Sequence, residues 1–182
     1  MTPDPTERPS SPEVLRGAIV ELHRVTPSDI DALLELWRSD ESVLDRWPRW
    51  SREDVEDVVA GEEGEAGWWI RVDGEPVGFI QHYQELDREY LHAGMDIFLI
   101  AAAQGRGAGT DAVRTLARHL VHDLGHHRLV IDPAADNARA IRCYEKVGFR
   151  PVGVMRKYEL GRDGTWHDNL LMDLLAEELV EG

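Results

Sequence analysis

The sequence lacks a second cysteine, a long apolar run and an excess of basic side chains. Cys143 is the single cysteine among 182 residues, so no disulfide can form within the chain, which suits a reducing cytoplasm. No apolar stretch approaches the length of a membrane span, and residues 1–16 lack the basic and apolar regions of a signal peptide. We therefore expect a cytoplasmic protein with no membrane partner.

Basic residues are outnumbered, because 20 lysines and arginines stand against 35 aspartates and glutamates, a formal charge of −15. Such a field repels nucleic acid and attracts cationic small molecules, although acidic surfaces also simply keep soluble proteins apart. We expect no nucleic-acid partner. The composition and length suit one hydrophobic core, so we expect a flexible leader at 1–16 and a single domain at 17–182.

Periodicity predicts an alternation of strands and helices in the order β-α-α-β-β-β-α-β-α-β-β. Thr26 and Ser51 are typical helix caps, and Asp73-Gly74 is typical of a tight hairpin turn. The clearest elements expected are a strand at 18–25, a hairpin at 67–84, a strand at 91–100, a helix at 110–124 closed by Gly125, a strand at 128–133 and a helix within 136–149.

Three glycines, at 105, 107 and 109, precede the helix expected at 110–124. Neither the Walker phosphate loop nor the dinucleotide fingerprint fits, because the first needs a lysine after the glycines and the second needs a glycine where Thr110 stands. Glycines at a helix N-terminus still let an anion approach unpaired N–H groups, and Arg106 adds positive charge. A plain strand-to-helix turn capped by Thr110 explains the glycines equally well.

Two linked motifs extend this interpretation. "QGRGAG" at 104–109 fits the Q/R-x-x-G-x-G/A pattern of the GNAT superfamily of acetyl-coenzyme A-dependent N-acyltransferases, and "DNARAIRCYEKVGF" at 136–149 resembles that superfamily's next motif. The resemblance covers roughly residues 18–175. It is closest to the aminoglycoside 6′-N-acetyltransferases, whose D-P-x-x-x-N-x-R-A-I-R-C-Y-E-K-x-G-F pattern matches "DPAADNARAIRCYEKVGF" at 132–149.

The resemblance implies an α/β GNAT fold, with a mixed, mostly antiparallel central sheet, helices on both faces and a V-shaped coenzyme A cleft. It implies transfer of the acetyl group of acetyl-CoA to an aminoglycoside amine, the 6′-amine in the family's pattern, by direct attack in a ternary complex without a metal. Antibiotic resistance would follow. Another small amine, a hydroxylysine siderophore precursor, a protein N-terminus or a non-catalytic coenzyme A sensor stay open as alternatives, and so do monomer and homodimer.

Two residues are the catalytic candidates. Tyr144 matches the tyrosine that the superfamily places beside the coenzyme sulfur, and a phenol that stays protonated at neutral pH can donate to a thiolate. Asp96 stands in the apolar run "MDIFLI", where the family has an acid facing the acceptor amine. A packed aromatic and an exposed strand residue are the structural alternatives for these two positions.

The remaining candidates fall into two groups. The residues expected to bind acetyl-CoA are Ile97, Phe98, Leu99, Gln104, Gly105, Arg106, Gly107, Ala108, Gly109, Thr110, Asn137 and Tyr144. Backbone amides of 97–99 would polarise the thioester carbonyl, whereas Asn137 is either a pantetheine ligand or a helix cap. The residues expected to bind the acceptor are Trp47, Gln81, Tyr83, Asp96 and Asp132.

Some of these candidates carry an open alternative. Trp47 and Trp50 fit an aromatic platform for sugar rings and a core plug equally. Asp132 marks either an acceptor contact or a strand end. Acidic residues at 85–89 would add negative potential to the acceptor cleft unless they form a solvated rim. Histidines cluster at 119–127, but no carboxylate or cysteine completes a well-spaced metal site, so we expect no metal.

Overall fold

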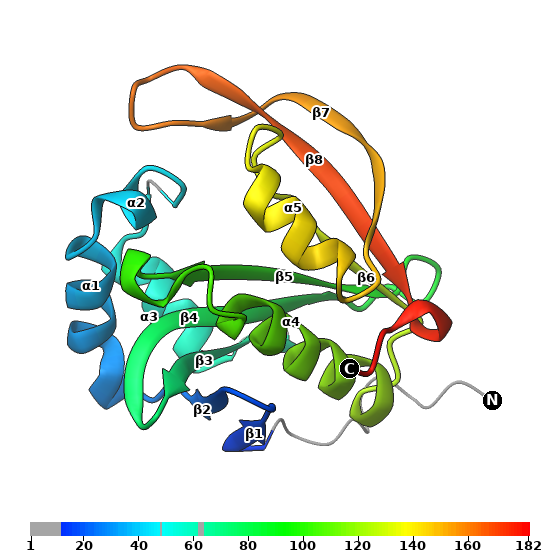
Figure 1. Ribbon diagram of the computed structural model, residues 1–182, viewed down its shortest axis with the longest axis horizontal. Coiled ribbons are helices and arrows are strands. Elements are labelled where there is room, and N and C mark those ends of the chain that lie inside the picture. Colours follow the sequence, from blue (N-terminus) through cyan, green and yellow to red (C-terminus); the bar gives the residue numbers. More distant parts are fainter. Residues whose placement is uncertain (1–11, 48, 62–63) are drawn as a thin grey trace.

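A computed structural model describes residues 12–182, apart from 48 and 62–63. Its centre is an eight-stranded sheet with the order β1-β2-β3-β4-β5-β6-β8-β7, and every neighbouring pair is antiparallel except β5–β6 (Figure 1). The strands are β1 (Val14–Arg16), β2 (Glu21–Arg24), β3 (Ala66–Val72), β4 (Glu75–Glu85), β5 (His92–Leu99), β6 (Arg128–Ile131), β7 (Arg150–Leu160) and β8 (Trp166–Leu175). The predicted mixed, mostly antiparallel α/β fold is confirmed.

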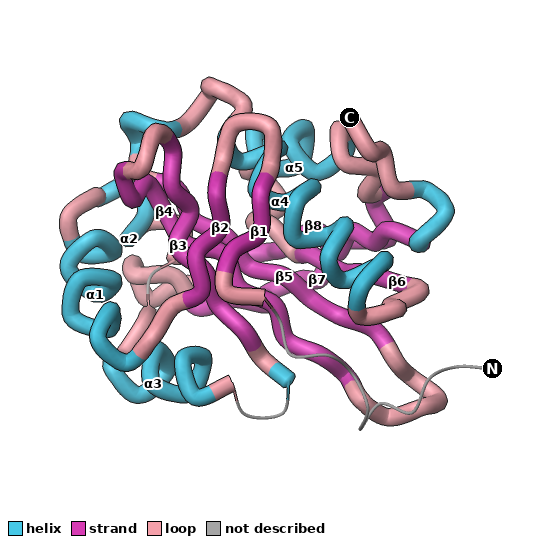
Figure 2. The backbone as a smooth tube through the Cα atoms, turned by 90° about the horizontal axis from the view of Figure 1, so that it is seen from below, coloured by secondary structure: helices cyan, strands magenta, loops and turns pink. Residues whose placement is uncertain are grey.

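Helices cover both faces of the sheet (Figure 2). The α-helices are α1 (Ile30–Arg38), α2 (Glu41–Leu44), α3 (Arg52–Ala60), α4 (Ala108–Arg118) and α5 (Ala138–Glu145). Shorter helical turns are η2 (Pro27–Asp29), η4 (Ala101–Ala103), the π-helical η5 (His119–Asp123) and η6 (Ala176–Glu178). Within the part of the chain that is described, the longest helix is α4, with 11 residues, and none is long and apolar enough to cross a bilayer.

Strand alternation divides the apolar side chains between two cores, because successive residues of a strand point to opposite faces. Trp68 lies in the larger core under α4 and α5, whereas the next residue, Trp69, lies in the smaller core under α1 and α3. Along β4, Phe79 and Ile80 divide in the same way. Both faces of β3 and β4 are therefore buried, which fixes the central strands rigidly.

Local capping signals set several element boundaries. Ser51 accepts a hydrogen bond from the Asp54 amide, and Asp54 accepts one from the Ser51 amide at 2.7 Å, which is a capping box at the start of α3. Asp73 and Gly74 have φ angles of 52° and 83°, as a two-residue hairpin turn between β3 and β4 requires. These two predictions are confirmed.

The structure differs from the sequence prediction at three places. Helix α2 (Glu41–Leu44) lies between the two helices that the sequence predicts ahead of the hairpin, where no third helix is expected. Val14–Arg16 form β1 and pair with β2, so this part of the expected leader 1–16 is a strand; residues 1–11 lie outside the described residues. Helix α4 begins at Ala108 rather than 110, with Gly107 as its N-cap at φ 91°, so Thr110 lies inside the helix. A glycine cap gives no side-chain signal, which is why the sequence places the start two residues late.

Strands β5 and β6 diverge after a short contact. They pair in parallel only at Ala93–Leu129 and Gly94–Val130, so the second half of β5 leaves β6 and opens a gap in the sheet. Figure 1 shows this gap between β5 and the unit formed by α5, β7 and β8. Both cavities described below lie at this gap.

Candidate active site

The glycine-rich loop closes one end of the gap. Gly105 and Gly107 have φ angles of 76° and 91°, a region that residues with a Cβ rarely adopt, so glycine is required at both positions. Gln104 ties the loop to β5, because its Nε2 donates to the Leu99 carbonyl at 2.7 Å. The N–H groups at the start of α4 have no earlier helical turn to bond and carry partial positive charge. The loop therefore has the backbone geometry of an anion cradle.

A cavity of about 280 Å³ lies against this loop, and we call it the loop cavity. Its lining includes Ile97, Phe98, Leu99, Gln104, Gly105, Gly107, Gly109, Thr110, Asn137 and Tyr144, all of which the sequence assigns to the coenzyme. Two further residues assigned there do not line it: Ala108 is buried in the larger core, and Arg106 is exposed. Most of the predicted coenzyme set is thus brought together.

The three backbone amides of β5 that are expected to polarise a carbonyl do not all point in the same direction. The amide of Ile100 donates to the Val77 carbonyl at 3.0 Å, on the β4 side. Because N–H directions alternate along a strand, the Phe98 amide also faces β4, whereas those of Ile97 and Leu99 face the gap. The side chain of Phe98 is only 6% exposed and packs in the smaller core.

Helix α5 contributes both an end and a charged face to the loop cavity. Asn137 caps the helix by accepting a hydrogen bond from the Ala140 amide at 3.2 Å, and it lines the cavity as well, so the cap is confirmed and the pantetheine contact stays a prediction. Arg139, Arg142 and Lys146 also line the cavity. Their spacing places three cations along one helix flank, an arrangement that suits phosphate groups and that sequence reasoning missed.

A second cavity of about 860 Å³ adjoins the first, and we call it the acidic cavity. The two share Arg46, Trp47, Ile97, Asn137 and Tyr144. The acidic cavity collects every residue that the sequence assigns to the acceptor: Trp47, Gln81, Tyr83, Asp96 and Asp132. Its carboxylates come from several elements, namely Asp54, Asp57, Glu65, Asp96, Asp132 and Glu159. Such a cavity favours a ligand with several positive charges.

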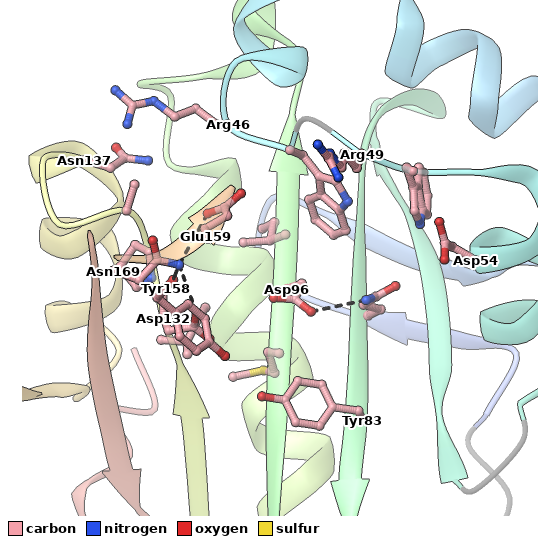
Figure 3. Close-up of a pocket in the computed structure, with 18 of the residues that line it drawn as sticks. Arg46, Arg49, Asp54, Tyr83, Asp96, Asp132, Asn137, Tyr158, Glu159 and Asn169 are labelled. Atoms are coloured by element: carbon pink, nitrogen blue, oxygen red, sulfur yellow. Dashed lines mark hydrogen bonds between the residues drawn. The ribbon is translucent and has the colours of Figure 1, made fainter. Parts of the chain in front are cut away.

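Asp96 lies on β5 and lines the acidic cavity (Figure 3). It is half-buried and accepts a hydrogen bond from Gln81 Nε2 at 3.2 Å. Burial, with a smaller contribution from the charges of Asp132 and Glu159, raises its pKa to about 6 against the opposing hydrogen bond from Gln81. A carboxylate with this pKa is ionised at neutral pH and can still take a proton, as a general base must.

Two tyrosines flank Asp96. Tyr144 is 7% exposed and lines both cavities, and burial raises the pKa of its hydroxyl well above the usual value. Burial, then the charges of Asp96 and Asp132, likewise raise the pKa of Tyr83. Both phenols therefore stay protonated throughout the neutral range and can act as hydrogen-bond donors into the acidic cavity.

Asp132 directly follows β6 and lines the acidic cavity to the left of Asp96 in Figure 3. Burial raises its pKa, whereas a hydrogen bond from Asn169 Nδ2 at 3.1 Å favours its ionised form. The carboxylate thus lines the cavity as well as marking the strand end.

The two tryptophans that sequence reasoning left open take different places. Trp50 is 6% exposed and belongs to the smaller core. Trp47 is half-buried, stacks edge-on against Phe98 at 5.4 Å between ring centroids, and lines both cavities. The carbonyl of Trp47 is held by Trp37 Nε1 at 2.9 Å. Trp47 is therefore the half-buried member of an otherwise buried aromatic group.

Several lining residues have no clear sequence signal. Asp54 and Asp57 on α3, Glu65 before β3, and Tyr158, Glu159 and Asn169 on the β7–β8 hairpin reach the acidic cavity only through tertiary packing. Conversely, the acidic run at 85–89 forms the exposed β4–β5 connection and does not line either cavity. This acidic run is therefore a solvated rim and not part of the acceptor cavity.

The expected histidine cluster is divided among separate contacts. His119 pairs with Asp123, His122 with Glu181 and His126 with Gln84, each at 2.7 Å. Among the residues that the structure describes, no three His, Cys, Asp or Glu side chains are grouped as metal ligands.

Comparison with known proteins agrees with this geometry. The model of the acetyltransferase (GNAT) domain family matches residues 20–150. A solved aminoglycoside acetyltransferase, AAC(6′)-Ib in complex with coenzyme A and kanamycin, superimposes with a TM-score of 0.70 at 30% identity, over 87% of this chain and 96% of that one. The fold and its paired cavities define an acetyltransferase. The chain belongs to the GNAT acetyltransferase family.

Two further proteins are similar to this chain, one in sequence and one in fold. Aminoglycoside N(6′)-acetyltransferase type 1 of Klebsiella pneumoniae is 31% identical over 154 residues, which cover 75% of this chain and 76% of the relative. RimJ of Mycobacterium smegmatis, solved with coenzyme A disulfide, has a TM-score of 0.81 at 23% identity and covers 94% of this chain and 91% of its own. The second likeness shows the fold alone.

Proposed function

We propose that this protein transfers the acetyl group of acetyl-CoA to an aminoglycoside, at the 6′-amine. The observation that carries the proposal is the acidic cavity, which lies directly beside the loop cavity and holds six carboxylates, Asp96 among them. A polycationic acceptor finds several partners there, and one of its amines reaches the gap where a thioester would lie. The similarity to aminoglycoside acetyltransferases supports this choice of acceptor. Resistance to the modified antibiotics follows.

The coenzyme would lie in the loop cavity. Amides at the start of α4 face its pyrophosphate, and the cations Arg139, Arg142 and Lys146 suit its other phosphate. The gap-facing amides of Ile97 and Leu99 lack a strand partner; the pantetheine arm would take that partner's place, and these amides would polarise the thioester carbonyl. Acetyl-CoA is thus a co-substrate held by backbone amides and by side-chain cations.

The transfer proceeds by direct attack. Asp96 takes the proton that the acceptor ammonium must lose before its nitrogen can attack the carbonyl carbon. As the N–C bond forms and the C–S bond breaks, Tyr144 protonates the departing thiolate. The second proton on the nitrogen and the proton held by Asp96 pass to solvent, from which Tyr144 is reprotonated. No covalent enzyme intermediate is required.

Thiol release with a matched pair of antibiotics tests this proposal. Neomycin and paromomycin differ only in carrying an amine or a hydroxyl at the 6′ position. With purified protein and acetyl-CoA, a thiol-reactive dye is expected to report release with neomycin and none with paromomycin. Release with both would move the acetylated amine elsewhere, release only with peptides would indicate a protein acetyltransferase, and coenzyme binding without any release would indicate a sensor.

Gly94 offers a test of the acceptor wall. It pairs with Tyr83 across β4 and β5, and a Cβ at this position would overlap the Tyr83 ring. Gly94→Ala is therefore expected to displace that ring, to lower stability by about 1–3 kcal/mol, and to raise KM for neomycin about tenfold. The dissociation constant for coenzyme A should stay unchanged, as measured by calorimetry.

The matched control is Gly153→Ala on β7, where the added Cβ would meet open space. It should leave both constants at wild-type values. If Gly94→Ala weakened coenzyme A binding as much as neomycin use, Tyr83 would have no separate role in the acceptor cavity.

A further inference from the structure

An irregularity in the β7–β8 hairpin shapes one wall of the acidic cavity. Met155 pairs with Asn169 and Glu159 pairs with His167, so three residues of β7, 156–158, oppose the single residue Asp168. Lys157 adopts a φ of 52°, unusual for a residue with a side chain, and its amide donates to Asp168 Oδ1 at 2.7 Å. This is a β-bulge, which bends a strand and redirects the side chains that follow it.

The redirected side chains are Tyr158 and Glu159, which both line the acidic cavity. Strand β8, which pairs with β7, is fixed at the same level by the segment after β6. The Leu170 amide donates to the Pro133 carbonyl at 2.8 Å, and the Ala135 amide donates to the Asp168 carbonyl at 2.8 Å. Strand β8 is thus fastened to β7 on one side and to the segment after β6 on the other. The carboxylates of Asp132, after β6, and Glu159, on β7, come together over β8.

Asn169 stands at that meeting point and is only 4% exposed. Its Nδ2 lies 3.1 Å from Asp132 Oδ2, 3.0 Å from the Asp132 carbonyl and 3.4 Å from Glu159 Oε2. One amide nitrogen therefore faces two carboxylates from different strands. Its Oδ1 is buried without a hydrogen-bond partner in the described structure, so the amide orientation that serves the carboxylates leaves its own acceptor unsatisfied.

We propose that Asn169 is a positioning residue that holds Asp132 and Glu159 as a paired binding site for an acceptor ammonium other than the one that is acetylated. The inference rests on the proposed function. An ammonium has three donors and can bridge two carboxylates. Figure 3 shows the Asp132, Asn169 and Glu159 group on one side of the cavity and Asp96 on the neighbouring strand β5.

The chemistry of the amide explains why it stands here. Two carboxylates brought together repel one another, and a shared N–H donor offsets that repulsion without adding a charge. A leucine of similar size would leave the carboxylates to separate toward solvent. The pair distinguishes acceptors by their number of amines, because an acceptor with a single amine uses Asp96 and has nothing to place between Asp132 and Glu159.

A double-mutant cycle with two acceptors tests this assignment. The variants are Asn169→Leu, Glu159→Gln and the double variant; the acceptors are neomycin and methyl 6-amino-6-deoxyglucoside, which has one amine. Each single variant is expected to raise KM for neomycin about tenfold with kcat within twofold. The kcat/KM for the monoamine should not change. The double variant should be no worse than Asn169→Leu alone, because Asn169 acts through Asp132 and Glu159.

Glu177→Gln is the matched control, since it removes an exposed negative charge on η6, away from both cavities. It should leave both acceptors unaffected. Additive losses in the double variant, or equal losses with both acceptors, would overturn the proposal. If Asn169→Leu fails to fold, Glu159→Gln still decides, because unchanged selectivity between the two acceptors would contradict the paired site. Absence of turnover with every aminosugar in the wild type would instead refute the proposed function.

Discussion

Asp96→Asn is expected to lower kcat with neomycin by about 10²–10⁴-fold, the contribution of a positioned general base. The variant keeps the size and the hydrogen-bonding capacity of the side chain, so the dissociation constant for coenzyme A should not change. Steady-state kinetics together with calorimetry of coenzyme A binding measure the two effects separately. Loss of turnover alone would place Asp96 at the acceptor amine.

The stability of the same variant separates chemistry from unfolding. Because the pKa of Asp96 is raised from 3.8 to about 6 in the folded state, the native protein binds the proton more tightly than the unfolded chain does. The carboxyl therefore costs no stability below pH 4, and the cost accrues as pH rises from about 4 to about 6 and then stays constant. At pH 7, Asp96→Asn should be more stable than wild type, by on the order of 2 kcal/mol.

A matched control is Asp73→Asn, which makes the same chemical change in the exposed turn between β3 and β4. Its turnover and urea midpoint should match those of the wild type. An Asp96→Asn enzyme that kept its activity would remove this carboxylate from the proposed mechanism. An Asp96→Asn enzyme that lost activity because it was less stable than the wild type would contradict the raised pKa of Asp96.

Tyr144→Phe is expected to lower kcat about 10²-fold, the lower end of what general acid catalysis contributes, with the coenzyme A dissociation constant within twofold of wild type. The ring packs on Phe149 with 6.3 Å between centroids, and phenylalanine preserves that contact. Only the proton donor is lost. Measuring kcat and the coenzyme A dissociation constant separately distinguishes a proton donor from a packed aromatic.

Tyr90→Phe supplies the comparison, because Tyr90 is 68% exposed on the β4–β5 connection and lines neither cavity. It should behave as wild type. Equal losses of kcat and coenzyme affinity in Tyr144→Phe would show that the tyrosine serves packing. An unchanged kcat would mean that solvent protonates the thiolate directly.

Local signals explain why much of the fold could be predicted from the sequence. The Ser51 capping box and the Asp73-Gly74 turn are decided within four residues of chain, and both occur where the sequence indicates. The start of α4 and strand β1 were not predicted correctly. Gly107 caps without a side chain, and β1 is a three-residue strand that depends on its pairing with β2.

The candidate site likewise combines residues that the sequence reveals with residues that it does not. Asp96, Tyr144 and the glycine loop lie in motifs that resemble known acetyltransferases, and the structure places them around one gap. Glu159 and Asn169 could not be predicted, because their position depends on a bulge in β7 and on the register of β8. A period-two pattern does not reveal which residues a bulge redirects.

The most direct test of the account is a carbon-13 NMR titration of the aspartate side-chain carboxyls, with the Asp96 signal identified by its absence in Asp96→Asn. In the unliganded protein, Asp96 should titrate with a pKa of about 6. Saturating neomycin should lower that pKa, because a bound ammonium favours the ionised carboxylate. A carboxyl that titrates near 4 and does not respond to neomycin would contradict the central claim that Asp96 receives the proton of the acceptor amine.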